Sequence, residues 1–329
     1  MKQVDSDKTM LSILKILDKQ HDIVIGSREL SRQLKMHGVN ISERTVRYHL
    51  RILDERGLTK VFGKEGRMIT PKGREELINA RVSEKVGFII SKIETLSYLT
   101  DLNLESGQGN VILNISCFPE KKLSEALRIM KPVFSSPYIM SDKVVLKKSG
   151  EKIGDFPVPK NMVGLGTVCS VTINGIFLKA GIPVTSRFGG VLQINSEPIR
   201  FTALISYEGS SLDPLEIFIK SRMTDIRSAV STDYGKILAS FREIPVVTLE
   251  KTLQLKENLK SKGIGGILLV GNPNQPLLEM PVGIDKAGMV IVGGLNPIAA
   301  LEEAGIQAVS KAMSTLYPFS ELVSFKDLY

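Results

Sequence analysis

The sequence is poor in the residues that build disulfide scaffolds and metal centres. Its 329 residues include two cysteines, Cys117 and Cys169, and three histidines, His21, His37 and His49. Two cysteines make no disulfide framework, so we expect a reducing cytoplasm. The histidines show no metal-ligand spacing with either cysteine, so we expect no metal and no resident cofactor.

Long apolar segments are also missing. No apolar run approaches the ~18–20 residues that cross a bilayer, and the N-terminus lacks the apolar core of a signal peptide. We therefore expect no membrane partner. Because 43% of the residues are hydrophobic and 24% are charged, the chain has the composition of a globular protein of two or three domains.

Catalytic motifs are absent too. The sequence holds no G-x-S-x-G nucleophile elbow, no Walker loop, no H-E-x-x-H motif and no kinase signature. No histidine lies beyond His49, so Cys169 has no histidine base in its own part of the chain. The sequence predicts a protein that is not an enzyme, with Cys169 as a small apolar residue lining a pocket.

Positive charge is concentrated at the N-terminal end. The net charge is +8, and residues 1–82 hold 17 lysines and arginines against 11 acidic residues. The remaining residues hold 26 against 24. This asymmetry predicts a polyanion partner, double-stranded DNA, for the first segment alone.

The order of elements in residues 1–81 is typical of a winged helix-turn-helix. Hydrophobic spacing predicts helices over 9–19, 28–36, 43–56 and 72–80, with hairpin strands over 59–62 and 67–70. Ser42 is placed to cap the third helix and Gly57 to end it. The second and third helices form the helix-turn-helix, and the third enters the major groove.

One face of the third helix is basic and the other is apolar. At ~100° per residue the basic face carries Arg44, Arg47, Tyr48 and Arg51, opposite Val46, Leu50 and Leu53. The start of a recognition helix approaches base edges, and later residues and the wing hold the backbone. We expect base contacts from Arg44, Thr45 and Tyr48, and backbone or minor-groove contacts from Arg47, Arg51, Lys60, Lys64 and Arg67. The alternatives are a solvated basic face and a protein-docking module.

Residues 82–106 are expected to form a connecting helix, as a linker, a dimer seam or a cap on the second domain, before a regulatory domain of mixed α/β class over 107–329. The predicted strands are 111–116, 167–173, 191–194, 201–207, 267–270 and 289–292, and the predicted helices are 123–130, 214–219, 253–262 and 297–304. A weak echo pairs Asn174 and Pro183 with Asn272 and Pro281. It indicates either a duplication with halves 107–198 and 199–310 or a chance likeness.

Hydroxyls, glycines and cations are concentrated between residues 164 and 190. Alternation along a strand at 167–173 would separate Thr167 and Cys169 from Ser170 and Thr172. Glycines let backbone N–H groups approach an anion, and arginine with hydroxyls suits a carboxylate or phosphate. The alternative is that the glycines serve tight turns. The predicted effector-binding residues are Thr167, Cys169, Ser170, Thr172, Asn174, Thr185, Ser186, Arg187, Gly189, Gly190 and Arg200.

Three sequence segments resemble those of a known protein family: GTVCSVTING (166–175), GIPVTSRFGG (181–190) and GGLNPIAALEEAG (293–305). With the winged-helix start, they resemble the archaeal nitrogen-responsive transcriptional repressors, the NrpR family, over essentially the whole chain. The resemblance implies a repressor of nitrogen-fixation and ammonia-assimilation genes that binds a palindromic operator as a homodimer. It also implies that 2-oxoglutarate, a small dicarboxylate, is the effector that releases the operator.

The chain departs from some family members in one respect. One regulatory unit follows the winged helix here, whereas some members carry two, so a separate regulatory-only chain is a further expected partner. Two other classes of function stay open. One is a small-molecule-converting enzyme fused to a DNA-binding module, and the other is a scaffold that docks another regulator.

Overall fold

The computed structural model describes residues 2–19, 23–78, 86–195 and 199–328. The chain separates into two compact units, Met1–Lys85 and Val86–Tyr329, each described by itself. The predicted boundary after residue 81 lies outside the described residues, as do the end of the fourth predicted helix and the first residues of the predicted linker. No helix in the described part of the chain is long and apolar enough to cross a membrane.

The first unit is the predicted winged helix-turn-helix. Its elements are α1 (Lys2–Lys19), α2 (Ser27–Met36), α3 (Glu43–Glu55), β1 (Thr59–Phe62), β2 (Gly66–Ile69) and α4 (Pro71–Ile78). Ser42 caps α3 by accepting from the Thr45 N–H at 3.2 Å, and Gly57 follows the helix with φ +72°. Val46, Leu50 and Leu53 are buried in the core, as the helical spacing predicts.

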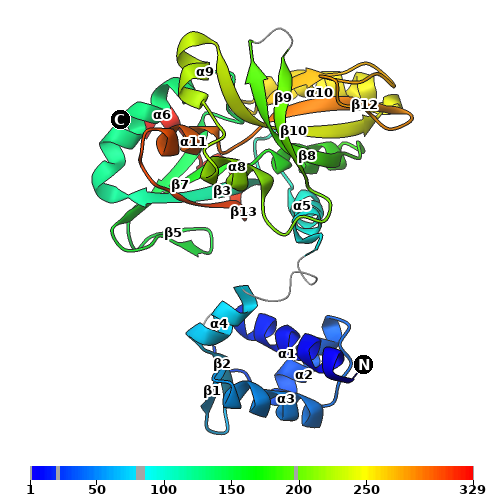
Figure 1. The fold of residues 1–329 in the computed structure, drawn as a ribbon, viewed down its shortest axis with the longest axis vertical. Helices are drawn as coiled ribbons and strands as arrows, with labels where there is room; N and C mark the ends of the chain where they lie inside the picture. Colours follow the sequence, from blue (N-terminus) through cyan, green and yellow to red (C-terminus); the bar gives the residue numbers. More distant parts are fainter. Residues whose placement is uncertain (1, 20–22, 79–85, 196–198, 329) are drawn as a thin grey trace. The chain divides into compact units, whose positions relative to one another are not determined.

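The second unit contains two five-stranded antiparallel sheets, with orders β13-β3-β7-β4-β14 and β11-β12-β10-β8-β9 (Figure 1). The first holds β3 (Asn110–Pro119), β4 (Lys143–Lys147), β7 (Met162–Val168), β13 (Val309–Pro318) and β14 (Val323–Ser324). The second holds β8 (Thr185–Ile194), β9 (Arg200–Ser206), β10 (Gly235–Pro245), β11 (Ile267–Val270) and β12 (Lys286–Val292). A short hairpin, β5 (Lys152–Ile153) and β6 (Phe156–Pro157), stands apart.

Seven helices of the described chain belong to this unit. They are α5 (Phe88–Leu99), α6 (Leu123–Phe134), α7 (Val171–Lys179), α8 (Pro214–Lys220), α9 (Ile226–Thr232), α10 (Leu249–Ser261) and α11 (Asn296–Glu303). Figure 1 shows α6, α9 and α11 gathered on one side of the sheets and α10 beside β12 on the other. The largest apolar core cluster joins α6, α8, α9 and α11 to β8, β10 and β12.

The strand order shows an internal repeat in which the last strands are exchanged. The series β3, α6, β4, β7, α7, β8 recurs as β10, α10, β11, β12, α11, β13. The sheet order β13-β3-β7-β4 then matches β8-β10-β12-β11, so each repeat lends its last strand to the other repeat's sheet. The strand register agrees residue by residue. Cys117 pairs with Val309 in the first sheet, and the corresponding residue Glu243 pairs with Thr185 in the second.

The same hydrogen bonds recur where each repeat turns from strand to helix. The Cys169 N–H donates to the Ile112 carbonyl at 2.8 Å, and the Gly293 N–H donates to the Leu238 carbonyl at 2.8 Å. Next in each helix, Thr172 accepts from the Ile112 N–H at 3.1 Å and Asn296 accepts from the Leu238 N–H at 2.9 Å (buried in both cases). The two repeats therefore share one backbone frame.

Two predictions about this unit are corrected by the structure. Residues 167–173 are not one strand, because β7 ends at Val168 and α7 begins at Val171. The predicted echo between Asn174 and Asn272 is also not the real repeat, which runs 110–194 and 235–318 rather than in halves 107–198 and 199–310. Six strands of this unit, β4, β5, β6, β10, β13 and β14, were not predicted at all.

The shared turn gives a test of stability. Asn296 is fully buried and bonds to both the N–H and the carbonyl of Leu238. Asn296→Ala leaves the buried Leu238 N–H without its partner, whereas the Leu238 carbonyl keeps the Gly293 N–H, so we expect the free energy of unfolding of the regulatory unit to fall by about 1–3 kcal/mol. Urea unfolding followed by circular dichroism measures it. Asn272→Ala, in an exposed loop, is the control and should change stability by less than about 0.5 kcal/mol; equal losses would contradict the role of Asn296.

Candidate functional site

The polar face of α3 is free of the winged-helix core. Arg44, Arg47, Tyr48 and Arg51 are all exposed, and Tyr48 is 53% exposed. The Arg51 guanidinium lies 5.9 Å from the centre of the Tyr48 ring. His49 lies on the opposite side, buried beside α1. The predicted basic face therefore exists as one continuous surface along the helix.

Two arginines of this face have acidic neighbours one turn away. Arg47 lies 3.5 Å from Glu43 and Arg51 lies 3.7 Å from Glu55, with all four side chains more than 40% exposed. Pairs this exposed contribute little to stability and can exchange for phosphate. Arg44 makes no ion pair within the described part of the chain.

The wing contributes exposed lysines and one arginine that is held internally. Lys60 and Lys64 are exposed, whereas the Arg67 Nε donates to Asp54 at 2.8 Å with both side chains about four-fifths buried. Asp54 also accepts from the Thr59 hydroxyl at 2.6 Å. Asp54, which the sequence analysis did not single out, thus joins α3 to both strands of the wing, and Arg67 braces this joint.

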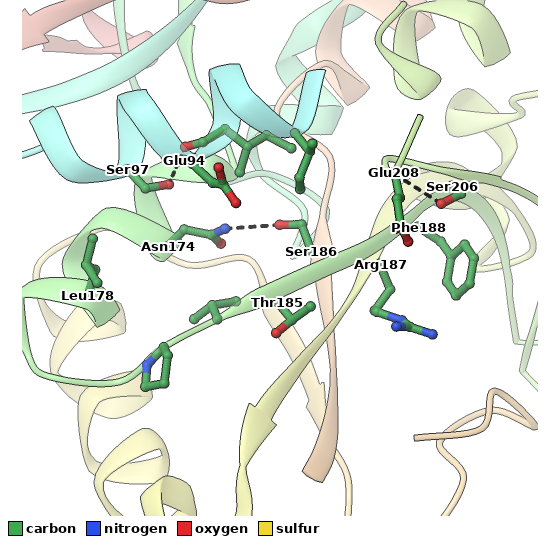
Figure 2. A pocket seen from close by; sticks show the side chains of 14 residues that line it. Glu94, Ser97, Asn174, Leu178, Thr185, Ser186, Arg187, Phe188, Ser206 and Glu208 are labelled. Atoms are coloured by element: carbon green, nitrogen blue, oxygen red, sulfur yellow. Dashed lines mark hydrogen bonds between the residues drawn. The ribbon is translucent and has the colours of Figure 1, made fainter. Parts of the chain in front are cut away.

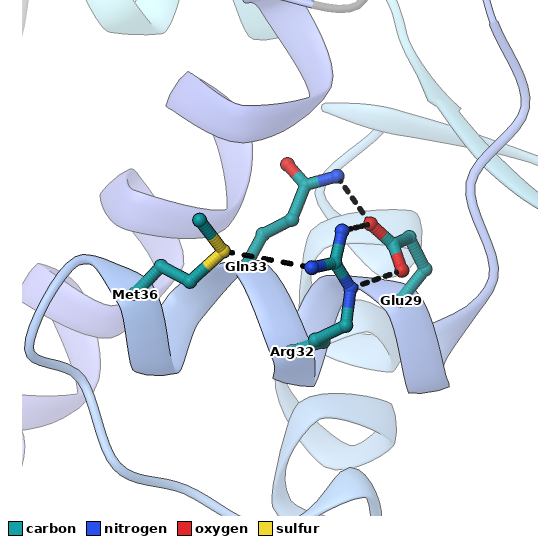
Figure 3. Close-up of polar contacts among 4 residues, drawn as sticks. All are labelled: Glu29, Arg32, Gln33 and Met36. Carbon is teal, nitrogen blue, oxygen red and sulfur yellow. Dashed lines mark hydrogen bonds and ion pairs between the residues drawn. The ribbon is translucent and has the colours of Figure 1, made fainter.

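On the outer face of α2, Arg32 is paired with Glu29, as Figure 3 shows, while Arg28 and Lys35 are also exposed. Arg32 donates to both carboxylate oxygens of Glu29, at 2.6 and 2.8 Å, and Gln33 donates to the same group at 2.7 Å. These bonds, with the Arg32 bond the largest cause, lower the pKa of Glu29 to about 2. Arg32 is therefore held more closely by its acidic partner than Arg47 or Arg51 of α3 are by theirs.

The regulatory unit has a cavity of about 710 Å³ between α5, α7 and β8 (Figure 2). Its walls combine apolar side chains with hydroxyl, amide and charged groups. The lining residues are Ile90, Ile93, Glu94, Ser97, Asn174, Leu178, Pro183, Val184, Thr185, Ser186, Arg187, Phe188, Ser206 and Glu208. A volume of this size suits a small organic ligand.

Some predicted effector residues meet at this cavity. The Asn174 side chain on α7 donates to the Ser186 hydroxyl on β8 at 3.0 Å, as Figure 2 shows. Ser170 does not line the cavity, but Arg242 on β10 is hydrogen-bonded to both Ser170 and Asn174. Arg242 donates to the Ser170 carbonyl at 3.0 Å, to the Ser170 hydroxyl at 2.8 Å and to the Asn174 side-chain oxygen.

The other predicted residues divide between the cavity rim and the packed interior. Thr185 and Arg187 lie at the rim, and Arg187 is 3.9 Å from Glu243. Thr167 donates to the Gly294 carbonyl, at 2.9 Å, and Thr172 is bonded to Ile112. Cys169, Gly189 and Gly190 are buried in close packing, so these glycines do not form an anion loop, and Arg200 pairs with Gln193 at the far end of β8.

Two buried groups of this unit, the Cys169 thiol and the Asp213 carboxyl, are shifted toward their neutral forms. Burial raises the pKa of Cys169 to about 11, so this thiol is protonated at neutral pH. Burial also raises the pKa of Asp213 to about 6, while the same carboxylate caps α8 through the Leu215 and Glu216 N–H groups. Cys169 is therefore a packed thiol and not an activated nucleophile.

Comparison with known proteins agrees with the two-unit architecture. The family described as "NrpR regulatory domains NRD1 and 2" matches residues 86–324, and the family described as "Ribonuclease R winged-helix domain" matches residues 11–77. A crystal structure of a nitrogen repressor-like protein from Methanococcus jannaschii superposes with a TM-score of 0.62 and 32% sequence identity. It covers 72% of this chain and 98% of that one.

Curated relatives match along nearly the whole chain. Global nitrogen regulator NrpRI of Methanosarcina mazei is 37% identical over 96% of this chain and 97% of its own length. Global nitrogen regulator NrpR of Methanococcus maripaludis is 33% identical over 96% of this chain, which spans only 54% of that protein. The predicted resemblance is confirmed: the chain belongs to the NrpR family of transcriptional regulators, with a winged helix followed by a regulatory region that matches the family's regulatory domains over residues 86–324.

Proposed function

We propose that the protein is a DNA-binding repressor of nitrogen-assimilation and nitrogen-fixation genes that acts in the cytoplasm and leaves its operator when 2-oxoglutarate binds. The observation that carries the proposal is the pairing, in one chain, of an exposed basic recognition helix with a cavity backed by a buried cation. The relatives named as global nitrogen regulators support the choice of genes.

The DNA half of the proposal rests on α3 and the wing. Arg44, Thr45 and Tyr48 lie in the first half of α3, the part of a recognition helix that reaches base edges. Arg47, Arg51, Lys60 and Lys64 then hold phosphates, and Arg67 fixes the wing through Asp54. A homodimer would place two such helices on half-sites about one helical turn apart, which a palindromic operator provides.

The effector half rests on the cavity between α5, α7 and β8. A small dicarboxylate needs hydrogen-bond donors at its charged ends and an apolar wall along its chain, and this cavity offers Asn174, Ser186, Ile90 and Ile93. The wall helix α5 is the first described helix after the winged-helix unit. A ligand that binds one position of α5 better than another shifts the population of that position and so changes the spacing of the recognition helices.

The two other classes of function fit less well. An enzyme would need a base or an activated nucleophile at the cavity, but no histidine follows His49 and Cys169 is protonated at neutral pH. A scaffold that docks another regulator would not need the polar set around Asn174. A regulatory-only partner chain stays compatible with the repressor, because this chain spans about half the length of two of its relatives.

The assignment of base and phosphate contacts predicts two different losses. The operator for this test is a sequence selected from random duplexes for tight binding. Arg44→Ala should reduce the difference in binding free energy between this operator and an unrelated duplex by about 1–3 kcal/mol. Lys64→Ala should weaken binding to both duplexes alike and lower the salt slope by about one. Fluorescence anisotropy at several salt concentrations measures both. Lys262→Ala, an exposed lysine of the regulatory unit, is the control for charge. Losses from Arg44→Ala that do not depend on sequence would overturn the base-contact assignment.

The effector assignment predicts a response to one dicarboxylate. Adding 2-oxoglutarate should weaken operator binding by roughly 5–150-fold, the usual range of coupling between two sites. Ser186→Ala should reduce this response, because it removes a polar partner of Asn174 at the cavity. Operator titrations with and without 2-oxoglutarate measure this change in affinity. A chloride salt at the same ionic strength is the control. Unchanged operator affinity at saturating 2-oxoglutarate would remove the sensor function, and an unchanged response in Ser186→Ala would favour the scaffold.

A further inference from the structure

Arg242 is the largest side chain in the described structure that is almost completely buried. It is 1% exposed and lies in the second half of β10, between Phe241 and Glu243. Its two terminal nitrogens are satisfied by Ser170, Asn174 and Ser240, the last at 3.3 Å. Its Nε is buried and has no hydrogen-bond partner within the described structure.

This guanidinium also lacks a counter-ion. No carboxylate of the described chain lies within ion-pair distance of it, and the partners that it does have are neutral. Burial lowers its pKa to about 10, so it stays charged at neutral pH. A buried, unpaired charge is costly, and folded proteins seldom keep one without a partner that is either present or supplied by a ligand.

The internal repeat shows that the fold does not need this arginine. Arg242 faces Ser186 and Met289 across the sheet, and in the other repeat Ser116 faces Ser310 and Leu165 in the same way. There the pair of serines is joined by a hydrogen bond of 2.8 Å between their hydroxyls. The same backbone position is thus filled by a small neutral residue in one half and by a large cation in the other.

The partner of Arg242 changes together with it. Asn174 on α7 corresponds in the repeat to Ile298 on α11, which is fully buried and apolar. One half of the regulatory unit therefore carries a cation, an amide and a hydroxyl where the other half carries two serines and an isoleucine. Because only the half with the cation has Asn174 and Ser186 at the wall of the 710 Å³ cavity, the change of chemistry coincides with a place for a ligand.

We propose that Arg242 is the residue that makes this cavity selective for carboxylates. It holds the Asn174 oxygen, which turns the Asn174 NH2 group toward Ser186 and the cavity, and it adds a positive potential behind them. A carboxylate at the wall then accepts from Asn174 and Ser186 and balances the buried charge. Arg242 acts through Asn174 as a positioning residue. This inference rests on the proposed effector function and goes further by naming the residue that selects the ligand's charge.

The test compares a dianion with its neutral form on the full-length protein. Isothermal titration calorimetry would measure 2-oxoglutarate and its dimethyl ester against the wild type and against the double variant Arg242→Ser/Asn174→Ile. This variant copies residues that the other repeat already buries, which favours folding, and circular dichroism checks it. We expect the wild type to prefer the dianion by roughly tenfold or more, and the double variant to lose that preference. Ser116→Ala, in the other repeat, is the control and should keep it.

Each result decides the question. A general structural role for Arg242 would weaken binding of the dianion and the ester equally, and that outcome overturns the inference, as does an unchanged preference in the double variant. If the wild type binds 2-oxoglutarate and its dimethyl ester with equal affinity, the inference is overturned by the wild type alone. If the wild type binds glutarate, succinate or citrate but not 2-oxoglutarate, and the double variant loses that binding, the selectivity stands and the proposed effector fails. If it binds none of these carboxylates, the inference fails.

Discussion

The exchange of β8 and β13 between the two repeats is the constraint on which the regulatory unit depends. Each sheet is completed by a strand from the other repeat, so neither repeat can close its own sheet. Thr167 strengthens this joint through its bond to Gly294, which links the turn of one repeat to that of the other. The exchange also brings β8 beside β10, and this neighbourhood places Ser186 next to Arg242 and Asn174.

A shared frame with different side chains explains how one half can carry a site. The strand-to-helix turns keep the same backbone bonds in both repeats, whether the side chain is Thr172 or Asn296. With the backbone held in this way, the interior of one half can hold a costly cation while the corresponding positions of the other half remain neutral. The shared backbone and the apolar core then supply stability, and the few positions at which the two repeats differ supply the chemistry of recognition.

Sequence reasoning succeeded where one period governs a segment. In α3 the spacing of Val46, Leu50 and Leu53 fixes which side is buried, because a single helix face packs on the core. It was wrong at 167–173, where β-branched residues favour a strand but the chain turns at Cys169 and Val171 begins a buried helix. Tertiary packing overrides propensity there. The repeat was placed wrongly because the corresponding turns share geometry and almost no residue types.

The Arg242 site could have been found from one signal that was not used. Two adjacent charged residues, Arg242 and Glu243, interrupt the run Ile-Leu-Ala-Ser-Phe-Arg-Glu-Ile (237–244), which otherwise has the composition of a buried strand. The partners of Arg242 could not have been found in this way, because they come from α7 and β8 and meet only through the strand exchange. Asp54 escaped notice for a similar reason, since its partners Thr59 and Arg67 lie on different strands of the wing.

The most direct test of coupling between the basic helix and the cavity uses its reciprocity. Calorimetry should measure the affinity of the full chain for 2-oxoglutarate alone and with saturating operator duplex. If the cavity controls DNA binding, the operator must weaken 2-oxoglutarate binding by the same factor by which 2-oxoglutarate weakens operator binding. An affinity for 2-oxoglutarate that is the same with and without operator would contradict the coupling.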